Sequence, residues 1–134
     1  MKVNIPSAPA ELVDKITILE IKASRVKDKQ KLVAVIRELT ALHKLFEAVQ
    51  SKSGKAKKEL LALKTKLSKV NLRLWRIEDK IRKMEDEKQF NNMFIQLARM
   101  VYVNNDERSR LKGKINVLLG ADFGEVKEYT KYKV

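Results

Sequence analysis

Residues 60–84 read LLALKTKLSKVNLRLWRIEDKIRKM, and they contain the most regular apolar pattern in the chain. Apolar residues recur in it at alternating intervals of three and four residues, a spacing that aligns them as one stripe along an α-helix. An average interval of 3.5 residues over more than three heptads indicates left-handed packing against a partner helix. The stretch therefore predicts one long helix over about residues 55–87. The seam positions are Leu60, Leu63, Leu67, Val70, Leu74, Ile77, Ile81 and Met84.

Three further helices are predicted from similar seams and from residues typical of helix ends, which are a proline, an aspartate and a glycine. Short connections favour antiparallel packing of neighbouring helices. We expect one all-α domain over residues 1–134, an elongated antiparallel bundle of three to four long helices with coiled-coil-like seams. The other predicted helices are 9–27, 29–52 and 91–119, and the tail 120–134 is expected to be strand-like or flexible.

Composition restricts the chemistry of the chain. It has no cysteine and one histidine, His43, so disulfides, thiolate metal sites and His-pair metal motifs are excluded, and no metal or cofactor is predicted. With a single histidine that nothing orients, a Ser/His/Asp catalytic set is not indicated either. No apolar run has the length of a membrane span, and the N-terminus lacks a signal-peptide core, so a soluble cytoplasmic protein is expected.

The chain is strongly basic, with 30 Lys and Arg against 17 Asp and Glu and a net charge of +13. Such a charge attracts polyanions, including nucleic acids and acidic proteins. Residues 52–69 contain seven lysines and a single acid, Glu59, but no aromatic residue, so contact with backbone phosphates rather than with bases is expected. The alternative is an ordinary solvated helix face. The candidate polyanion-binding residues are Lys52, Lys55, Lys57, Lys58, Lys64, Lys66 and Lys69.

The seam of residues 91–119 is interrupted by two polar residues, Asn104 and Arg108, which the periodicity directs toward the core. A buried charge is costly unless it is paired, so carboxylates are expected opposite them. The candidates for this polar layer are Glu78, Asp79, Asp14 and Glu20, with Lys15, Trp75, Arg82, Tyr102 and Glu107 nearby.

Two interpretations of this layer remain open. It is either a buried ion-pair network that fixes helix register or the lining of a small anion pocket inside a bundle. The first favours a non-enzymatic binding or adaptor protein. The second favours a small helical enzyme or anion-binding protein, with Arg82 or Arg108 as the anion clamp and Glu78 or Glu107 as general acid or base. A homodimer is a third hypothesis, since the helix of residues 55–87 is longer than its predicted neighbour 29–52.

Three segments resemble an uncharacterised family of short all-helical bacterial and phage proteins: residues 9–22 (PAELVDKITILEIK), 74–82 (LWRIEDKIR) and 101–108 (VYVNNDER). The resemblance covers nearly the whole chain. It implies no established activity, and it implies the host cytoplasm if the protein is phage-encoded. The family pattern has polar residues at the positions of Asp14, Lys15, Thr17, Glu20, Glu78, Asp79, Arg82, Asn104, Asp106, Glu107 and Arg108.

Overall fold

The computed structural model describes all residues, 1–134, and contains helices but no strand. The predicted all-α class is therefore confirmed. A short 3₁₀ turn, η1, separates the second helix from the third and delays the start of the third to Lys57. The α-helices are α1 (Pro9–Arg25), α2 (Lys29–Ser53), α3 (Lys57–Asp86) and α4 (Asn92–Leu118), and η1 comprises Gly54–Ala56.

The helices end where local chemistry satisfies the terminal backbone groups. The Asp28 carboxylate accepts a hydrogen bond from the Lys31 backbone N–H at 2.9 Å, and so caps α2. The Asn91 side chain caps α4 in the same way, with 3.1 Å to the backbone N–H of Phe94. Three residues leave the helical conformation with positive φ, the backbone state that stops a helix: Gly54 (53°), Lys88 (56°) and Gly120 (59°).

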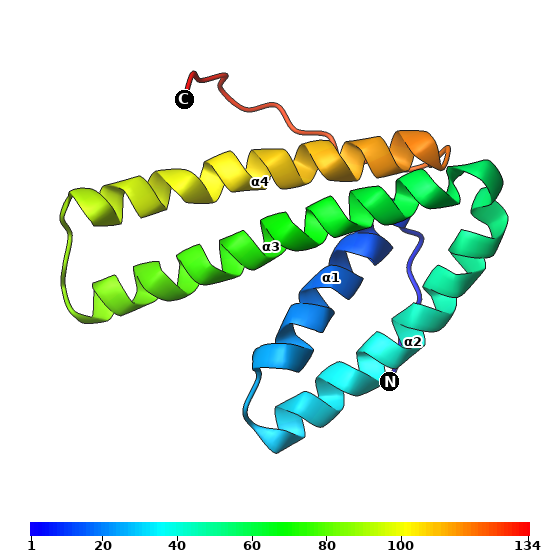
Figure 1. The fold of residues 1–134 in the computed structure, drawn as a ribbon, viewed down its shortest axis with the longest axis horizontal. Coiled ribbons are helices and arrows are strands. Elements are labelled where there is room, and N and C mark those ends of the chain that lie inside the picture. The colour runs from blue at the N-terminus through cyan, green and yellow to red at the C-terminus, as the bar shows by residue number, and fades with distance from the viewer.

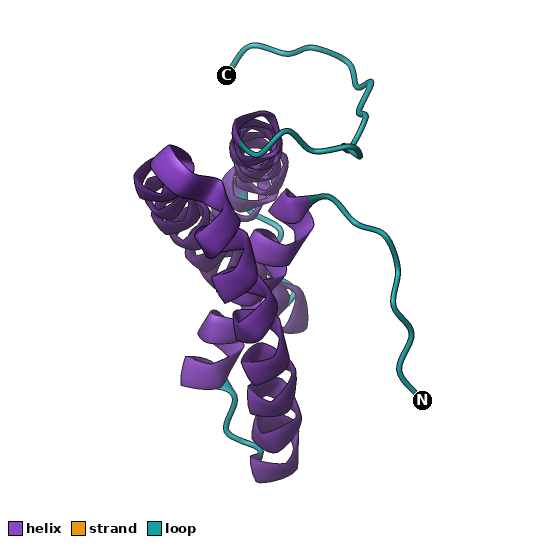
Figure 2. Ribbon diagram, turned by 90° about the vertical axis from the view of Figure 1, so that its right-hand side faces the viewer, coloured by secondary structure: helices purple, strands orange, loops and turns teal.

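The four helices form two hairpins that meet at one end. Figure 1 shows α3 and α4 running antiparallel side by side, while α1 and α2 diverge from them as a second hairpin. Figure 2 shows the α1–α2 hairpin extending away from the α3–α4 pair. Helix α1 contacts all three other helices, whereas α2 packs mainly against α1. One end of α3 and α4 is therefore covered by α1, and the other end projects as a two-helix hairpin.

The hydrophobic core lies where the hairpins meet, and every helix contributes to it. Its fully buried members, at 0% exposed, come from α1, α3 and α4: Ala10, Val13, Ile16, Leu60, Leu67 and Ile115. In the projecting half, seam residues such as Leu74, Ile81 and Leu97 are only half-buried. The core residues are Ala10, Val13, Ile16, Phe46, Leu60, Leu63, Leu67, Val70, Leu111 and Ile115.

The tail after α4 forms neither helix nor strand, so the strand-like arm suggested by the sequence does not form. It nevertheless packs on α4, because the Tyr132 ring meets the Tyr102 ring edge-on at 5.1 Å between centroids. The Tyr132 hydroxyl also donates a hydrogen bond to Asp106.

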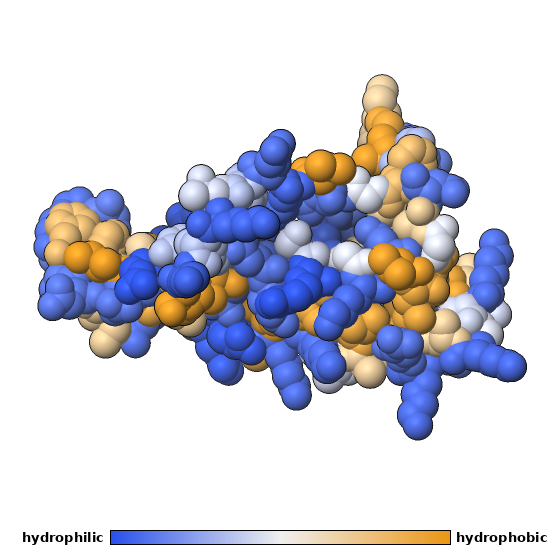
Figure 3. All heavy atoms as spheres, turned by 90° about the horizontal axis from the view of Figure 1, so that it is seen from above, coloured by the Kyte–Doolittle hydropathy of each residue, from blue (hydrophilic) through white to orange (hydrophobic).

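Seen from above in Figure 3, the surface is mainly hydrophilic, with apolar residues in separate patches. No helix combines the length and the hydropathy that crossing a bilayer requires.

Candidate functional site

An ion pair between α4 and α1 lies at the junction of the two hairpins. Arg108 donates from Nε to Asp14 Oδ1 at 2.9 Å and from Nη2 to Asp14 Oδ2 at 2.5 Å. The Asp14 side chain is 5% exposed and that of Arg108 is 29% exposed. This two-point geometry is the strongest form of an arginine–carboxylate contact. It binds α4 to α1 across 94 residues of sequence.

Helix α3 completes the same cluster through Asn71. The amide nitrogen of Asn71 donates to Asp14 Oδ1 at 2.9 Å and to the Thr17 hydroxyl at 2.8 Å. Thr17 in turn donates to the backbone carbonyl of Asp14 at 2.7 Å. Asp14, Thr17, Asn71 and Arg108, here named the junction network, therefore connect three helices. Asp14, Thr17 and Asn71 are buried, at 4%, 0% and 5% exposed.

The junction network holds Asp14 in its ionised form. Burial by itself raises the pKa of this carboxyl group, but hydrogen bonds from Arg108 and Asn71, together with the charges of Arg108 and Lys112, outweigh burial and lower the pKa. The Asp14 hydrogen bonds raise the pKa of Arg108 in return. Both partners therefore remain charged at neutral pH.

A second basic residue of α4, Lys112, lies one turn beyond Arg108 and is 9% exposed. Its ammonium group is 2.9 Å from Glu11 of α1 and 3.4 Å from Glu125 of the tail. Burial alone lowers the pKa of Lys112, but the Glu11 hydrogen bond and the charges of Asp14, Glu11 and Glu125 raise it overall. These contacts extend the α1–α4 attachment toward the tail.

Asn104 is also buried, at 1% exposed, but its surroundings differ from the expectation. Its side-chain oxygen accepts from Arg73 Nη1 of α3 at 2.9 Å, and its amide donates to the Met100 carbonyl at 2.8 Å. The predicted carboxylate partner is absent because Asn104 faces α3 on the flank away from α1. An arginine donor satisfies it instead.

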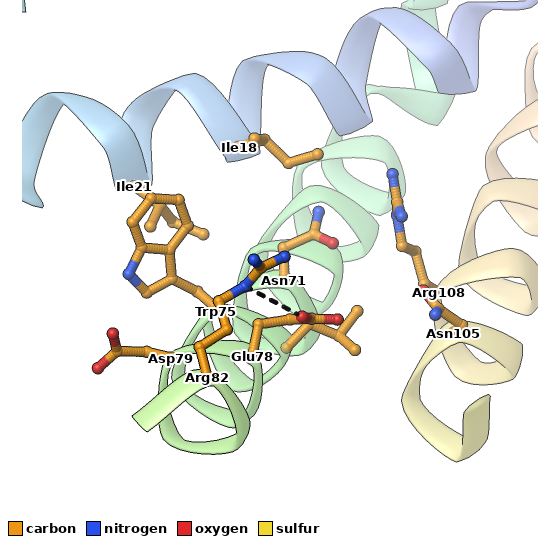
Figure 4. Close-up of a pocket in the computed structure, with 10 residues that line it drawn as sticks. Ile18, Ile21, Asn71, Trp75, Glu78, Asp79, Arg82, Asn105 and Arg108 are labelled. Atoms are coloured by element: carbon orange, nitrogen blue, oxygen red, sulfur yellow. Dashed lines mark ion pairs between the residues drawn. The ribbon is translucent and has the colours of Figure 1, made fainter. Parts of the chain in front are cut away.

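An open cleft of about 580 Å³ lies beside the junction network, between α1, α3 and α4. Figure 4 shows Ile18 and Ile21 of α1 on one side, the Trp75 ring next to them, and Arg108 across the hollow on α4. The rim carries an ion pair between Arg82 and Glu78 at 3.7 Å. We name this hollow the junction cleft. Its lining residues are Ile18, Ile21, Asn71, Leu74, Trp75, Glu78, Asp79, Arg82, Asn105 and Arg108.

Several residues predicted for the polar layer lie elsewhere. Lys15 pairs with Glu38 of α2 at 2.5 Å, and Glu20 pairs with Lys64 of α3 at 2.9 Å. Glu107 pairs with Arg110 on the opposite flank of α4. These residues neighbour the seam in sequence, but the helix turns them away from Arg108.

Two other predictions need correction. Tyr102 is 44% exposed and packs against the tail instead of lining the layer. Asp79 reaches the cleft but pairs with Lys83 at 3.1 Å on its own helix.

The surface of α3 carries a second candidate site. The residue immediately before each of six successive seam positions, from Leu67 to Met84, is basic, and every one of them is exposed. Because residues before and after a seam position lie on opposite flanks of a helix, these side chains share the flank away from Asn71 and α1. This α3 basic face comprises Lys66, Lys69, Arg73, Arg76, Lys80 and Lys83.

The α3 basic face is nearly free of acidic partners. Only Lys83 forms an ion pair, the one with Asp79, and Arg73 is held by Asn104. A groove between α3 and α4 borders the face and adds Arg110 and Lys114 from α4. Two acids, Glu59 and Glu107, are the only negative side chains lining that groove.

The seven lysines predicted from residues 52–69 do not form one surface. Lys66 and Lys69 belong to the α3 basic face, while Lys64 lies on the other flank against Glu20. The remaining four, Lys52, Lys55, Lys57 and Lys58, are exposed around the α2–η1–α3 connection.

Asn71, Lys112 and the larger part of the α3 basic face are not among the residues predicted from the sequence. The sequence does contain a signal for that face. Its basic residues repeat at the same intervals of three and four residues as the apolar seam, each one position before a seam residue. Asn71 and Lys112 had no such signal, since either could equally face solvent. No group of three or more His, Asp or Glu side chains is arranged to hold a metal ion.

The network, the cleft and the basic surface are the candidate sites of this helical protein. A family model described as a family of unknown function, DUF6165, matches residues 1–131. The chain therefore belongs to this family. No curated protein and no solved structure matches it significantly.

Proposed function

We propose that this protein is a non-enzymatic binding protein that holds a nucleic acid by its phosphate backbone through the α3 basic face. The observation that carries the proposal is the line of six exposed basic side chains from Lys66 to Lys83. They span about 26 Å at 1.5 Å per residue. A regular row of positive charge suits a regular row of phosphates.

The chemistry of the face favours a nucleic acid over an acidic protein. Protein–protein interfaces generally have an apolar centre with a polar rim, whereas the α3 basic face has no apolar residue of its own. It also has no aromatic side chain, so base stacking of the kind used by single-strand binders is not available. Sequence-independent contact with a duplex backbone is the expected mode.

The catalytic alternative has weaker support. Nε and Nη2 of Arg108 are occupied by Asp14, and Arg82 is paired with Glu78. Neither arginine is therefore an uncommitted anion clamp. Glu107 lies against Arg110, away from the cleft, so it is not near a substrate bound beside Arg108.

The test is duplex DNA binding measured by fluorescence anisotropy over a range of salt concentrations. We expect the triple variant K69Q/R76Q/K80Q to lose affinity, and the slope of log K against log salt to shrink by about 3, roughly 0.9 per phosphate contact. The matched control is K27Q/K29Q/K44Q, which removes the same charge from the α1–α2 hairpin and should retain most of the affinity.

Three outcomes would contradict the proposal. Absence of binding at low salt removes nucleic acid as the partner. Equal losses in both triple variants mean that net charge, and not the α3 basic face, governs binding. Binding of poly-glutamate but not of DNA, with the same sensitivity to K69Q/R76Q/K80Q, replaces the nucleic acid by an acidic protein.

A further inference from the structure

The junction cleft is lined by polar groups that the fold holds in place but that form no hydrogen bond within the chain. Asn71 commits both N–H groups of its amide to Asp14 and Thr17, so its Oδ1 is oriented away from them and accepts no hydrogen bond from the chain. No fully buried polar side-chain atom lacks a partner. Since Asn71 Oδ1 has no partner, it is not fully buried and is accessible to solvent. Asn71 lines the junction cleft.

Arg108 provides the complementary donor. Its Nε and Nη2 are taken by Asp14, while Nη1 makes no hydrogen bond within the chain. Both Asn71 and Arg108 line the cleft and are held in place by the same carboxylate, so the acceptor and the donor are fixed relative to each other. Asn105, three residues before Arg108 on α4, adds a further amide to the lining.

The walls of the cleft are apolar and include one aromatic ring. Ile18 and Ile21 of α1 lie beside Trp75, and Figure 4 shows this ring next to the hollow. A volume of about 580 Å³ is within the range of small-ligand sites. Indole rings stack on other planar rings with favourable energy.

The charges of the site disfavour an anionic ligand. Glu78, Asp79 and the Asp14 carboxylate behind the lining oppose only two guanidinium groups, those of Arg82 and Arg108. An anion accepting from Arg108 would also meet the Asn71 oxygen, which is another acceptor. A ligand that presents a donor beside its acceptor avoids this repulsion and leaves neither polar group unpaired.

We propose that the junction cleft binds an uncharged planar ring carrying a carbonyl acceptor and an N–H donor side by side. The carbonyl accepts from Arg108 Nη1, the N–H donates to Asn71 Oδ1, and the ring packs on Trp75. Aromatic carboxamides and the edges of nucleobases share this chemistry. The site is on the flank of α3 opposite the α3 basic face, so it does not depend on polyanion binding.

Fluorescence gives a direct test, because Trp75 is the only tryptophan in the chain. Nicotinamide and nicotinate are the matched probes, since they share a ring and differ in amide against carboxylate, and uridine is a nucleobase probe. We expect saturable quenching by nicotinamide with a dissociation constant in the millimolar range, as for a fragment of this size. Nicotinate should bind roughly tenfold more weakly, since it cannot satisfy the Asn71 acceptor.

Controls separate binding from collision and from loss of fold. N-acetyltryptophanamide gives the collisional quenching of a free indole. Ile18→Phe fills the cleft while leaving the junction network intact, and should abolish saturable quenching with unchanged circular dichroism. Arg76→Gln removes a positive charge from the α3 basic face, on the flank of α3 opposite the cleft, and should leave the affinity within about twofold.

The relative affinities of the three probes distinguish the possible ligands. Tighter binding of uridine than of nicotinamide supports the proposal with a nucleobase as ligand, and the reverse order supports it with a carboxamide. Quenching by both neutral probes that never saturates, as with free indole, overturns the proposal. So does tighter binding of nicotinate than of nicotinamide, which would make the cleft an anion site.

Discussion

Asp14 accepts hydrogen bonds from two helices other than its own, α3 through Asn71 and α4 through Arg108. A buried carboxylate of this kind adds little net stability compared with a well-packed apolar side chain, but it becomes very costly when its partner is removed. We therefore expect the junction network to act mainly by specifying how the two hairpins dock. A shift of α4 by one residue would move Arg108 to another face and leave the buried Asp14 carboxylate without its counter-charge.

Replacing Arg108 by Met should destabilise the protein by about 3 kcal/mol, since Asp14 would remain buried without its counter-charge. Chemical denaturation of the variant measures this loss. Adding Asp14→Asn to Arg108→Met removes the stranded charge and should recover part of it. The control is Arg76→Met on the exposed α3 basic face, for which a change within about 0.5 kcal/mol is expected. A loss from Arg108→Met no larger than the control's would show that the pair has no structural role.

Individual residues of this network were predictable only in part. The seam period directs Arg108 inward, and the cost of a buried charge requires a carboxylate, for which Asp14 was one of four candidates. The period does not determine on which flank of α3 the first hairpin packs. Asn71 follows the seam residue Val70, so it is buried only if α1 packs on that flank of α3. If α1 packed on the opposite flank, Asn71 would be a solvent-exposed amide, and for this reason it could not be predicted.

At the scale of helices, the turn between α3 and α4 contains a residue in an unfavourable conformation. Lys88 has a φ of 56°, and no glycine stands at this helix end. The backbone N–H of Gln89 bonds to the Met84 carbonyl at 2.8 Å, which is the six-to-one bond of a Schellman turn. The sequence predicts a turn near this position, but no glycine or proline in residues 86–92 fixes where it occurs.

Lys88→Gly should therefore stabilise the protein by about 0.5–1 kcal/mol, because glycine adopts a positive φ without steric cost. The same substitution in the middle of α3, Lys80→Gly, should destabilise it by about 1 kcal/mol. Thermal unfolding followed by circular dichroism compares the two variants. If Lys88→Gly lowers the melting temperature, the turn does not impose the strain that its φ implies.

The α3 basic face shows why a charged surface is harder to predict than a core. Residues 52–69 have the highest density of lysine, yet the helix distributes those side chains around its whole circumference. The row from Lys66 to Lys83 is less dense in sequence but falls on one flank. It becomes a distinct surface only because α1 covers the opposite flank, and the choice of flank depends on tertiary packing.

For the molecule as a whole, the all-helical class and the approximate helix limits followed from apolar period and from end signals. The divergence of the two hairpins could not be predicted from the sequence. The seam residues indicate which face of a helix is apolar, but they do not indicate the angle at which that helix crosses its neighbour. In α2 only Phe46 is buried, although its seam repeats as regularly as that of α3. Its apolar stripe packs mainly on α1, with few contacts to α3, which leaves most of it half-buried.

The stability of the whole molecule should fall at acid pH, and Asp14 should account for a definable part of that fall. The pKa of Asp14 in the folded protein is below its ordinary value of 3.8. A carboxyl group with a depressed pKa contributes stability that is fully present above the unfolded pKa and is lost as pH falls through the folded pKa. The loss begins below about pH 5 and continues below pH 4, while the remaining carboxylates protonate and the net charge rises above +13.

Urea unfolding between pH 7 and pH 2.5 separates these two effects. Asp14→Asn should be less stable than the wild type at neutral pH and should show a shallower decline, because one linked proton is removed. Asp122→Asn, a change in the exposed tail, should decline in parallel with the wild type. Equal slopes for all three proteins would mean that charge repulsion alone drives acid unfolding. In that case Asp14 would titrate alike in the folded and unfolded states, contrary to the contacts of the junction network.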